Sequence, residues 1–212
     1  MLRRRWLKVV VFLLCLAPFV YLAWRFYRQD LTANPLEYIT HFTGDWALRL
    51  IVATLAITPL RKLLQLPDLI RFRRMIGVYA FFYASLHFLT YLWLDRLFDF
   101  HDLGKDIAKR PFITMGFTAF VLMTPLAITS TKGWIRRLGG KRWQLLHRLI
   151  YISGIAAVIH YKWLVKSDFR LPYMYGAIIG VLLLYRVAAW VRGRMAVAAV
   201  RRLQPGGRTI GA

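Results

Sequence analysis

Apolar residues fall into six long runs that carry almost no charge and are separated by polar segments. Each run is close to the length that a helix needs to cross a hydrocarbon core of about 30 Å at about 1.5 Å per residue. Apolar and polar residues do not alternate within the runs, so strands are not expected. We therefore predict an all-α membrane protein, a bundle of six transmembrane helices over Leu7–Trp24, Trp46–Leu60, Ile76–Leu94, Phe112–Ile128, Leu145–Leu164 and Tyr173–Trp190.

The segments between the runs alternate in charge. Of the 31 Lys and Arg, 20 lie in the N-terminal residues, in the 61–74 and 130–143 connections and from Arg186 onwards. Nine lie in the remaining three connections or, for Lys162, at the end of the run before the last one, and these connections also hold all but one of the nine Asp and Glu. Lys and Arg concentrate on the cytoplasmic side of membrane proteins. Both termini are therefore expected in the cytoplasm.

Composition agrees with a basic membrane protein. The chain has 212 residues, of which 58% are hydrophobic, and a formal charge of +22. The positive charge is divided between apolar runs, which favours contact with anionic lipid over nucleic-acid binding. The single Cys15 excludes a disulfide framework and a thiolate metal centre. We expect one helical domain over 1–190 and a basic tail over 191–212, which could form an interfacial helix.

Three histidines lie inside predicted transmembrane helices, where a polar side chain is costly and therefore indicates a functional or structural role. His87 lies in the third run, and His147 and His160 lie in the fifth. Counted from the inner surface at 1.5 Å per residue, they sit at depths of roughly 20, 8 and 27 Å. His87 is therefore nearer in depth to His160 than to His147.

Buried imidazoles on neighbouring helices suit haem, whose iron can take one ring on each side. The sequence predicts one haem between His87 and His160, and His147 would support a second haem or act as an alternative ligand. Hydrogen bonding between helices, or a proton path in a small transporter or channel, is the alternative use of these histidines. His41 and His101 are expected as solvated histidines of the outer loops. His41 lies next to the second run, where contact with a porphyrin edge or a partner is the alternative.

Other candidate chemistry is sparse. The sequence has no Ser-His-Asp set, P-loop or GxGxxG motif, so no catalytic residue is predicted. Gly139 and Gly140 are typical of a connection between helices. Most basic residues of the inner side are expected to contact lipid, and some could bind a haem propionate, a flavin phosphate or a flavoprotein.

Short motifs occur in a fixed order along residues 5–190 and give the chain a family resemblance. They are His41-Phe42-Thr43-Gly44, Ile57-Thr58-Pro59-Leu60, Arg73-Arg74 with Gly77, Leu86-His87, Arg110-Pro111, Thr129-Ser130-Thr131, Trp143 to His147, and Ile159-His160-Tyr161. Together with six spans, this set resembles the MsrQ (YedZ) family, within the ferric-reductase-like transmembrane group that includes the membrane half of NADPH oxidases.

The resemblance implies a function. MsrQ proteins are haem b subunits of the bacterial inner membrane, and FMN is associated with them. They pass electrons to the periplasmic molybdopterin enzyme MsrP, which repairs methionine sulfoxide in envelope proteins. The family's intramembrane histidines correspond to His87, His147 and His160.

The electron donor is expected to be another molecule. About 22 residues follow Trp190, too few for the nucleotide-binding domain of an NADPH oxidase. A cytosolic flavin reductase, a reduced flavin or a membrane quinol would then supply the electrons. Within the same fold, the alternative function is a ferric reductase or an oxidase.

Overall fold

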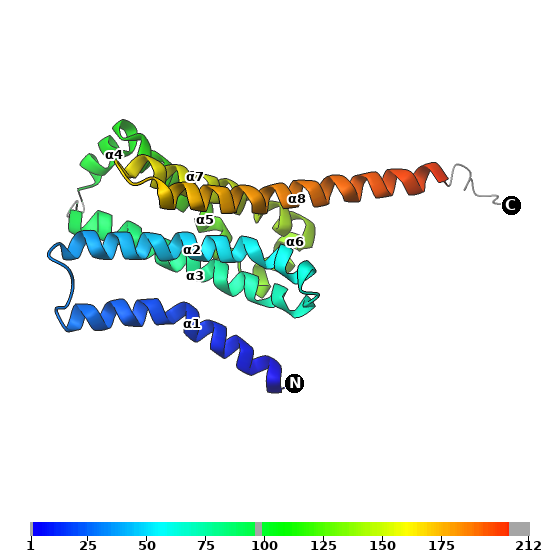
Figure 1. Cartoon of the computed structure of the whole chain (residues 1–212), viewed down its shortest axis with the longest axis horizontal. Helices are drawn as coiled ribbons and strands as arrows, with labels where there is room; N and C mark the ends of the chain where they lie inside the picture. Colours follow the sequence, from blue (N-terminus) through cyan, green and yellow to red (C-terminus); the bar gives the residue numbers. More distant parts are fainter. Residues whose placement is uncertain (1, 96–98, 204–212) are drawn as a thin grey trace.

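The computed structural model describes residues 2–95 and 99–203, and within them it is helical without strands. Long helices lie side by side, with a short helix across one end of the bundle and a kinked helix at the other (Figure 1). The α-helices are α1 (Leu2–Tyr27), α2 (Pro35–Leu63), α3 (Ile70–Thr90), α4 (Phe100–Lys109), α5 (Pro111–Ile128), α6 (Lys132–Leu146), α7 (Leu149–Leu164) and α8 (Arg170–Leu203). A 3₁₀ turn, Pro67–Leu69, precedes α3, and a π-helical turn, Tyr91–Asp95, follows it.

The six predicted runs coincide with α1, α2, α3, α5, α7 and α8. Within the described residues, four stretches are long and apolar enough to cross a membrane: Arg5–Tyr27, Pro67–Trp93, Pro111–Ile128 and Arg170–Ala196. The apolar α7 is shorter, at 16 residues. α2 has 29 residues and carries charged residues such as Asp45 and Arg49, an ion pair with a 3.5 Å nitrogen–oxygen distance.

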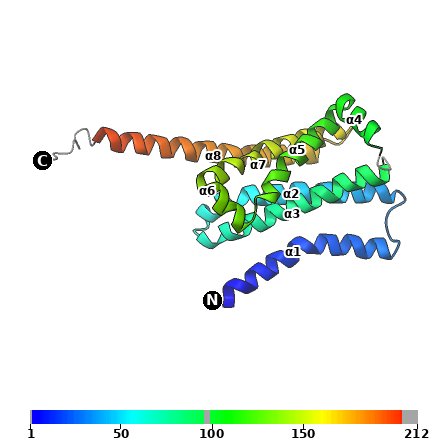
Figure 2. The same cartoon turned by 180° about the vertical axis from the view of Figure 1, so that it is seen from behind.

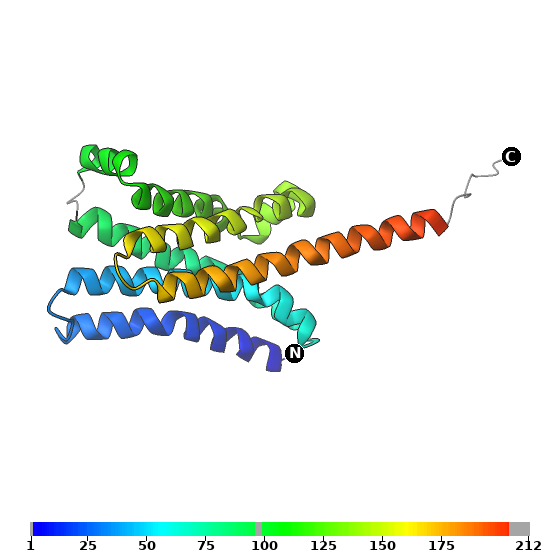
Figure 3. The same ribbon diagram turned by 45° about the horizontal axis from the view of Figure 1, so that its top comes forward.

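The described basic segments gather at one end of the bundle. The N-terminus, the α2–α3 connection, α6 and the last turns of α8 lie toward the same end, while α4 lies at the opposite end (Figure 2). α8 has 34 residues and continues beyond the other helices (Figure 3). The tail expected from residue 191 is therefore helical up to Leu203, and its position on a membrane surface stays a prediction. Residues 204–212 lie outside the described part.

Two helix pairs, α2 with α3 and α5 with α7, form the centre of the bundle. Small side chains allow close contact there, and Ala80 and Ser153 are 0% exposed. The Ser153 hydroxyl donates to the Ala119 carbonyl across the α5–α7 contact, 3.0 Å away. Leu55 and Tyr83 are also fully buried. Close packing with few internal polar groups is what holds helices together where lipid surrounds them.

Tyr83 joins α3 to α1 by replacing a bond inside α1. Its hydroxyl donates to the Cys15 carbonyl at 2.8 Å and accepts from the Phe19 amide at 3.0 Å. In a regular helix that amide would donate to that carbonyl directly. Pro18 lies in the same turn, and α1 bends near its middle (Figure 1).

A second proline explains the position of a half-buried arginine. Pro59 has no amide hydrogen, so the Leu55 carbonyl one turn earlier loses its helical donor. Arg186 of α8 supplies that donor, with Nη2 at 2.8 Å from the carbonyl oxygen. Nη1 also donates to the Tyr151 hydroxyl at 3.1 Å. Arg186 thus connects α8 to both central pairs.

The prediction of a single fifth helix over Leu145–Leu164 is wrong. The structure has two helices there, α6 and α7, which meet at His147 and Arg148. Gly139 has φ 73°, a left-handed conformation that glycine adopts without strain, and it breaks α6 as the glycine pair predicted. His147 is the C-cap of α6, so it does not lie within the same helix as His160.

Candidate functional site

His87 of α3 and His160 of α7 come together in the bundle. Their ring centroids are 6.0 Å apart and their planes make an angle of 77°. Both helices bring the histidine near the end of the bundle at which α4 lies. The sequence expectation that these two are the matched pair in depth therefore agrees with their position in the fold.

Each of the two rings has one nitrogen engaged by a backbone carbonyl. His87 Nδ1 lies 2.9 Å from the Thr40 oxygen, and His160 Nδ1 lies 2.6 Å from the Phe112 oxygen. A carbonyl only accepts, so Nδ1 carries the proton in both rings. Each neutral ring then keeps the lone pair of Nε2, which is the atom available to a metal.

Two glycines make room for the rings. A Cβ on Gly44 of α2 would lie 3.0 Å from His87 Nδ1, and a Cβ on Gly116 of α5 would lie 2.7 Å from His160 Nδ1. In each case the bonded carbonyl, Thr40 or Phe112, stands one helical turn before the glycine. Each histidine therefore lies against the backbone of the neighbouring helix.

Both rings line a mostly apolar cavity of about 280 Å³. Its walls come from α2, α3, α5 and α7, with Tyr91 and Ile107 at the α4 end. The apolar and aromatic lining includes Leu48, Ile51, Phe88, Phe117, Phe120, Met123 and Leu164. An apolar lining with a few polar groups at the centre is typical of a site for a largely apolar ligand.

The spacing of the rings fits a shared metal ion. Two metal–nitrogen bonds of about 2 Å, plus the distance from each nitrogen to its ring centre, place two imidazole centroids about 6 Å apart. Among the described residues, no cluster of three or more His, Cys, Asp or Glu has the arrangement of a metal site. A site with two protein ligands is complete when a macrocycle supplies the others, as in haem proteins.

His147 lies away from this pair, at the far end of α7. Its Nε2 is 3.4 Å from the Thr129 hydroxyl, and its ring centroid is 3.8 Å from that of Trp143. The Thr129 hydroxyl already donates to the Pro125 carbonyl at 2.6 Å, so it can only accept from His147. At 3.4 Å this is a weak contact, and it becomes a hydrogen bond only with the His147 proton on Nε2, the opposite tautomer to that of the pair.

His41 and His101 are exposed, as expected, but both lie in helices and not in loops. His41 lies inside α2, because this helix begins at Pro35, and it lines both the cavity and a groove near the start of α2. Asn34 caps that early start by accepting from the Glu37 amide. His101 is an exposed residue of α4.

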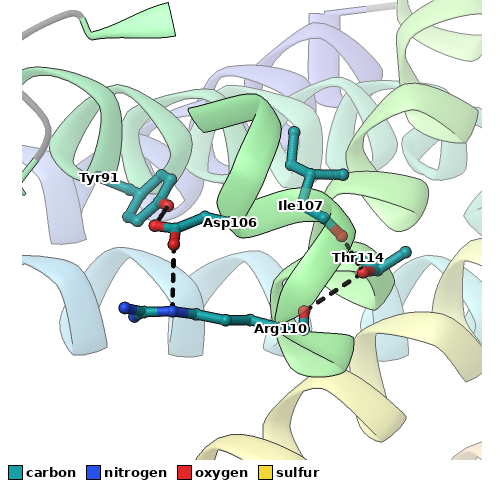
Figure 4. A network of polar contacts seen from close by, with 5 residues as sticks. All are labelled: Tyr91, Asp106, Ile107, Arg110 and Thr114. Carbon is teal, nitrogen blue, oxygen red and sulfur yellow. Dashed lines mark hydrogen bonds and ion pairs between the residues drawn. The ribbon is translucent and has the colours of Figure 1, made fainter. Parts of the chain in front are cut away.

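A polar network fixes α4 across the end of the cavity. Asp106 accepts from the Tyr91 hydroxyl at 2.8 Å and forms an ion pair with Arg110 at 3.1 Å (Figure 4). The Thr114 hydroxyl contacts the Ile107 and Arg110 carbonyls. Tyr91 and Ile107 are cavity-lining residues, so this network positions part of the wall.

Sequence reasoning did not identify Gly116, and it cited Gly44 only within a motif. The available signal was a glycine inside an apolar helical run, where alanine forms the better helix. The partner of each glycine could not be read from the sequence, because it lies on another helix.

Comparison with known proteins places these features in a family. Residues 43–158, which contain both glycines and His87, match the family described as "Ferric reductase like transmembrane component". This class of membrane protein is consistent with the helical fold and the histidine pair. No solved structure matches the chain.

Several close relatives carry one name, "Protein-methionine-sulfoxide reductase heme-binding subunit MsrQ". That of Herminiimonas arsenicoxydans is 54% identical, over 87% of this chain and 86% of its own. That of Caulobacter vibrioides is 49% identical over 84% and 85%, and that of Polaromonas naphthalenivorans is 45% identical over 92% and 93%. The chain belongs to the MsrQ family.

Proposed function

We propose that the chain is a haem b electron-transfer subunit in which His87 and His160 are the axial ligands of the haem iron. The observation that carries the proposal is the ring pair, 6.0 Å apart, with both Nδ1 atoms on backbone carbonyls. A haem held there supplies a one-electron carrier within the membrane. The name of the relatives, which includes heme binding, supports the same cofactor.

The contribution of the protein is to hold and enclose the cofactor. The two carbonyl bonds orient the rings, and the apolar walls exclude water from the porphyrin faces. Two histidine ligands fill both axial positions, which favours electron transfer over binding of a substrate at the iron.

The proposed arrangement in the membrane has six spans with both termini in the cytoplasm, in the bacterial inner membrane. Four described helices, α1, α3, α5 and α8, meet the length and composition of a span. α2 and α7 do not, but they pack against these helices in the same bundle, which supports counting them as spans too. The basic segments at the terminal end support the orientation. Membrane lipid would contact the exposed apolar residues of α1 and α8.

In this orientation the histidine pair lies toward the periplasm. We propose that the haem held by this pair passes electrons to a periplasmic partner, the molybdopterin methionine sulfoxide reductase MsrP. The reductase in the name of the relatives supports this acceptor. The electron donor would be a flavin reductase or reduced FMN at the cytoplasmic end. The alternative donor is a quinol within the bilayer.

His147 is not needed for the proposed haem. Its tautomer and its contact with Thr129 turn Nε2 toward a hydroxyl. It becomes a ligand only if the purified protein holds a second haem, which the haem-to-protein ratio measures.

Reoxidation of the reduced protein tests the proposal. We would reduce the purified protein with dithionite, remove the excess and follow the haem absorbance after adding oxidised MsrP or ferric citrate. Rapid reoxidation by MsrP, and slow reoxidation by ferric citrate, is the expected result. Equal rates would favour a ferric reductase, and a protein that stays colourless after reconstitution with haem would favour a transporter or channel.

A further inference from the structure

The two histidines lie in two similar environments on different helix pairs. In the first, the ring of His87 from α3 lies against Gly44 of α2 and donates to the Thr40 carbonyl of α2. In the second, Gly116 and the Phe112 carbonyl of α5 receive His160 from α7. We call these the His87 seat and the His160 seat.

Glycine in the middle of a helix needs an explanation, because it forms helices less well than alanine. Both seat glycines lie inside their helices, and the space that a side chain would fill is occupied by imidazole. A Cβ on Gly116 would lie 2.7 Å from Nδ1 and 2.9 Å from Cε1 of His160. A Cβ on Gly44 would lie 3.0 Å from Nδ1 and 3.1 Å from Cε1 of His87.

The glycine and the carbonyl act on the same ring atom. Nδ1 is the atom that donates to the carbonyl, and it is also the atom nearest to the missing Cβ. A methyl group at either glycine would therefore displace the ring from its hydrogen bond. Without that bond the ring can turn and can protonate on Nε2, which removes the lone pair needed by a metal.

We propose that Gly44 and Gly116 are positioning residues, which hold His87 and His160 in the orientation and tautomer that bind haem iron. This inference rests on the proposed function, since it concerns the same cofactor. It adds two residues of α2 and α5 that do not touch the iron and that act through the histidines.

The two seats differ in how closely the ring approaches its carbonyl and its glycine, so the two glycine substitutions should differ in the size of their effect. The His160 seat has the shorter hydrogen bond, 2.6 Å against 2.9 Å, and the closer approach to glycine. Gly116→Ala should therefore displace its histidine more than Gly44→Ala does.

The chain offers matched control glycines on the histidine-bearing helices. A Cβ on Gly77 of α3 would lie 3.6 Å from Thr54, and one on Gly154 of α7 would lie 3.5 Å from Ile51, which are ordinary contacts. Gly77→Ala and Gly154→Ala thus make the same chemical change within the two helices without meeting a histidine ring.

The first test measures haem affinity and spin state for the four alanine variants of the full chain. We expect Gly116→Ala to bind haem about ten- to a hundredfold more weakly, the usual effect of losing a residue that orients a ligand. Its remaining haem should show a high-spin component in the absorption and electron paramagnetic resonance spectra. Gly44→Ala should show a smaller change in the same direction, and both controls should resemble the wild type. Wild-type affinity and spectra in both seat variants would overturn the proposal.

The second test does not depend on haem. In haem-free protein, Gly116→Ala should lower the melting temperature when His160 is present, and should have no such effect in a His160→Ala background, because the ring that the methyl group meets is gone. An equal loss of stability in both backgrounds, or failure of the double variant to fold, would overturn the role of Gly116.

The two tests also separate this inference from the proposed function. If the wild type binds no haem, the proposed function fails, and the second test still decides whether the glycine positions the ring. If His87→Ala and His160→Ala lose haem while both seat variants keep it with wild-type spectra, only the inference about the glycines fails.

Discussion

The histidine pair near the α4 end of the bundle and His147 near the opposite end differ in which ring nitrogen has a hydrogen-bond partner. In His87 and His160, a main-chain carbonyl binds Nδ1, so Nε2 keeps its lone pair. In His147, a threonine hydroxyl that is already a donor accepts from Nε2. The pair lines a cavity, whereas His147 packs on Trp143 at the junction of two helices.

The difference shows that a histidine within an apolar segment is not by itself evidence of a ligand. The partner of the second ring nitrogen decides whether the first can bind a metal. By this criterion the His87–His160 pair has both Nε2 atoms available for the proposed iron, whereas His147 contacts Thr129 at the end of α5 from the α6–α7 junction.

The largest effect should come from removing either histidine of the pair. His87→Ala and His160→Ala should each reduce bound haem by more than about tenfold, since each removes an axial ligand. The haem-to-protein ratio of the purified variants measures this. His101→Ala is the control, because His101 is an exposed residue of α4 that does not line the cavity, and this variant should keep its haem. Full haem content in both variants of the pair would contradict the ligand assignment.

Tyr83→Phe should lower stability without altering the haem spectrum. The change removes the hydroxyl that bonds the Cys15 carbonyl and the Phe19 amide of α1. Leaving such groups unpaired costs about 1–3 kcal/mol, which a thermal melt of the detergent-solubilised protein would detect. Tyr79→Phe is the matched control on the same helix and should melt like the wild type. A changed haem spectrum in Tyr83→Phe would mean that α1 also shapes the site.

His147→Ala should keep the haem bound by the pair. Its expected cost is about 0.5–1.5 kcal/mol, from loss of the ring contact with Trp143. Haem content and the melting temperature, measured on one preparation, separate the two effects. Loss of the low-spin haem signal in this variant would contradict the distinction between His147 and the His87–His160 pair.

Asp106→Asn should have the smallest effect of the four. It removes the ion pair with Arg110, whose side chain is 51% exposed, and pairs of that kind contribute about 0.2–1 kcal/mol. The amide can still accept from Tyr91, so α4 should stay in place and the haem spectrum should not change. Hydrogen exchange of the α4 amides would report the expected small increase in opening, and a marked loss of haem would show that α4 has a larger role in closing the cavity.

The sequence predicted much of the fold because length and apolarity are local properties. Five of the six runs lie within single helices, counting the π-helical turn that continues α3, the fifth run lies mostly within α7, and the glycine pair at Gly139 marked a real break. The prediction failed at the junction of α6 and α7, because His147 and Arg148 join the two helices without a glycine or proline that would signal a break. The predicted start of α2, at Trp46, was also too late. The first turns after the Asn34 cap contain polar and charged residues, so they do not belong to an apolar run.

The candidate site was predictable in part. Depth in the membrane identified His87 and His160 as partners, because both could be counted from basic residues at the surface. The roles of Thr40, Gly44, Phe112 and Gly116 were not predictable, since each depends on contact with a ring from another helix.

The most direct test of the central claim is the low-temperature electron paramagnetic resonance spectrum of the oxidised, purified full-length protein. The account predicts a low-spin ferric signal from iron with two imidazole ligands. A purely high-spin signal, or no haem signal after reconstitution, would contradict the claim that His87 and His160 hold haem iron between them.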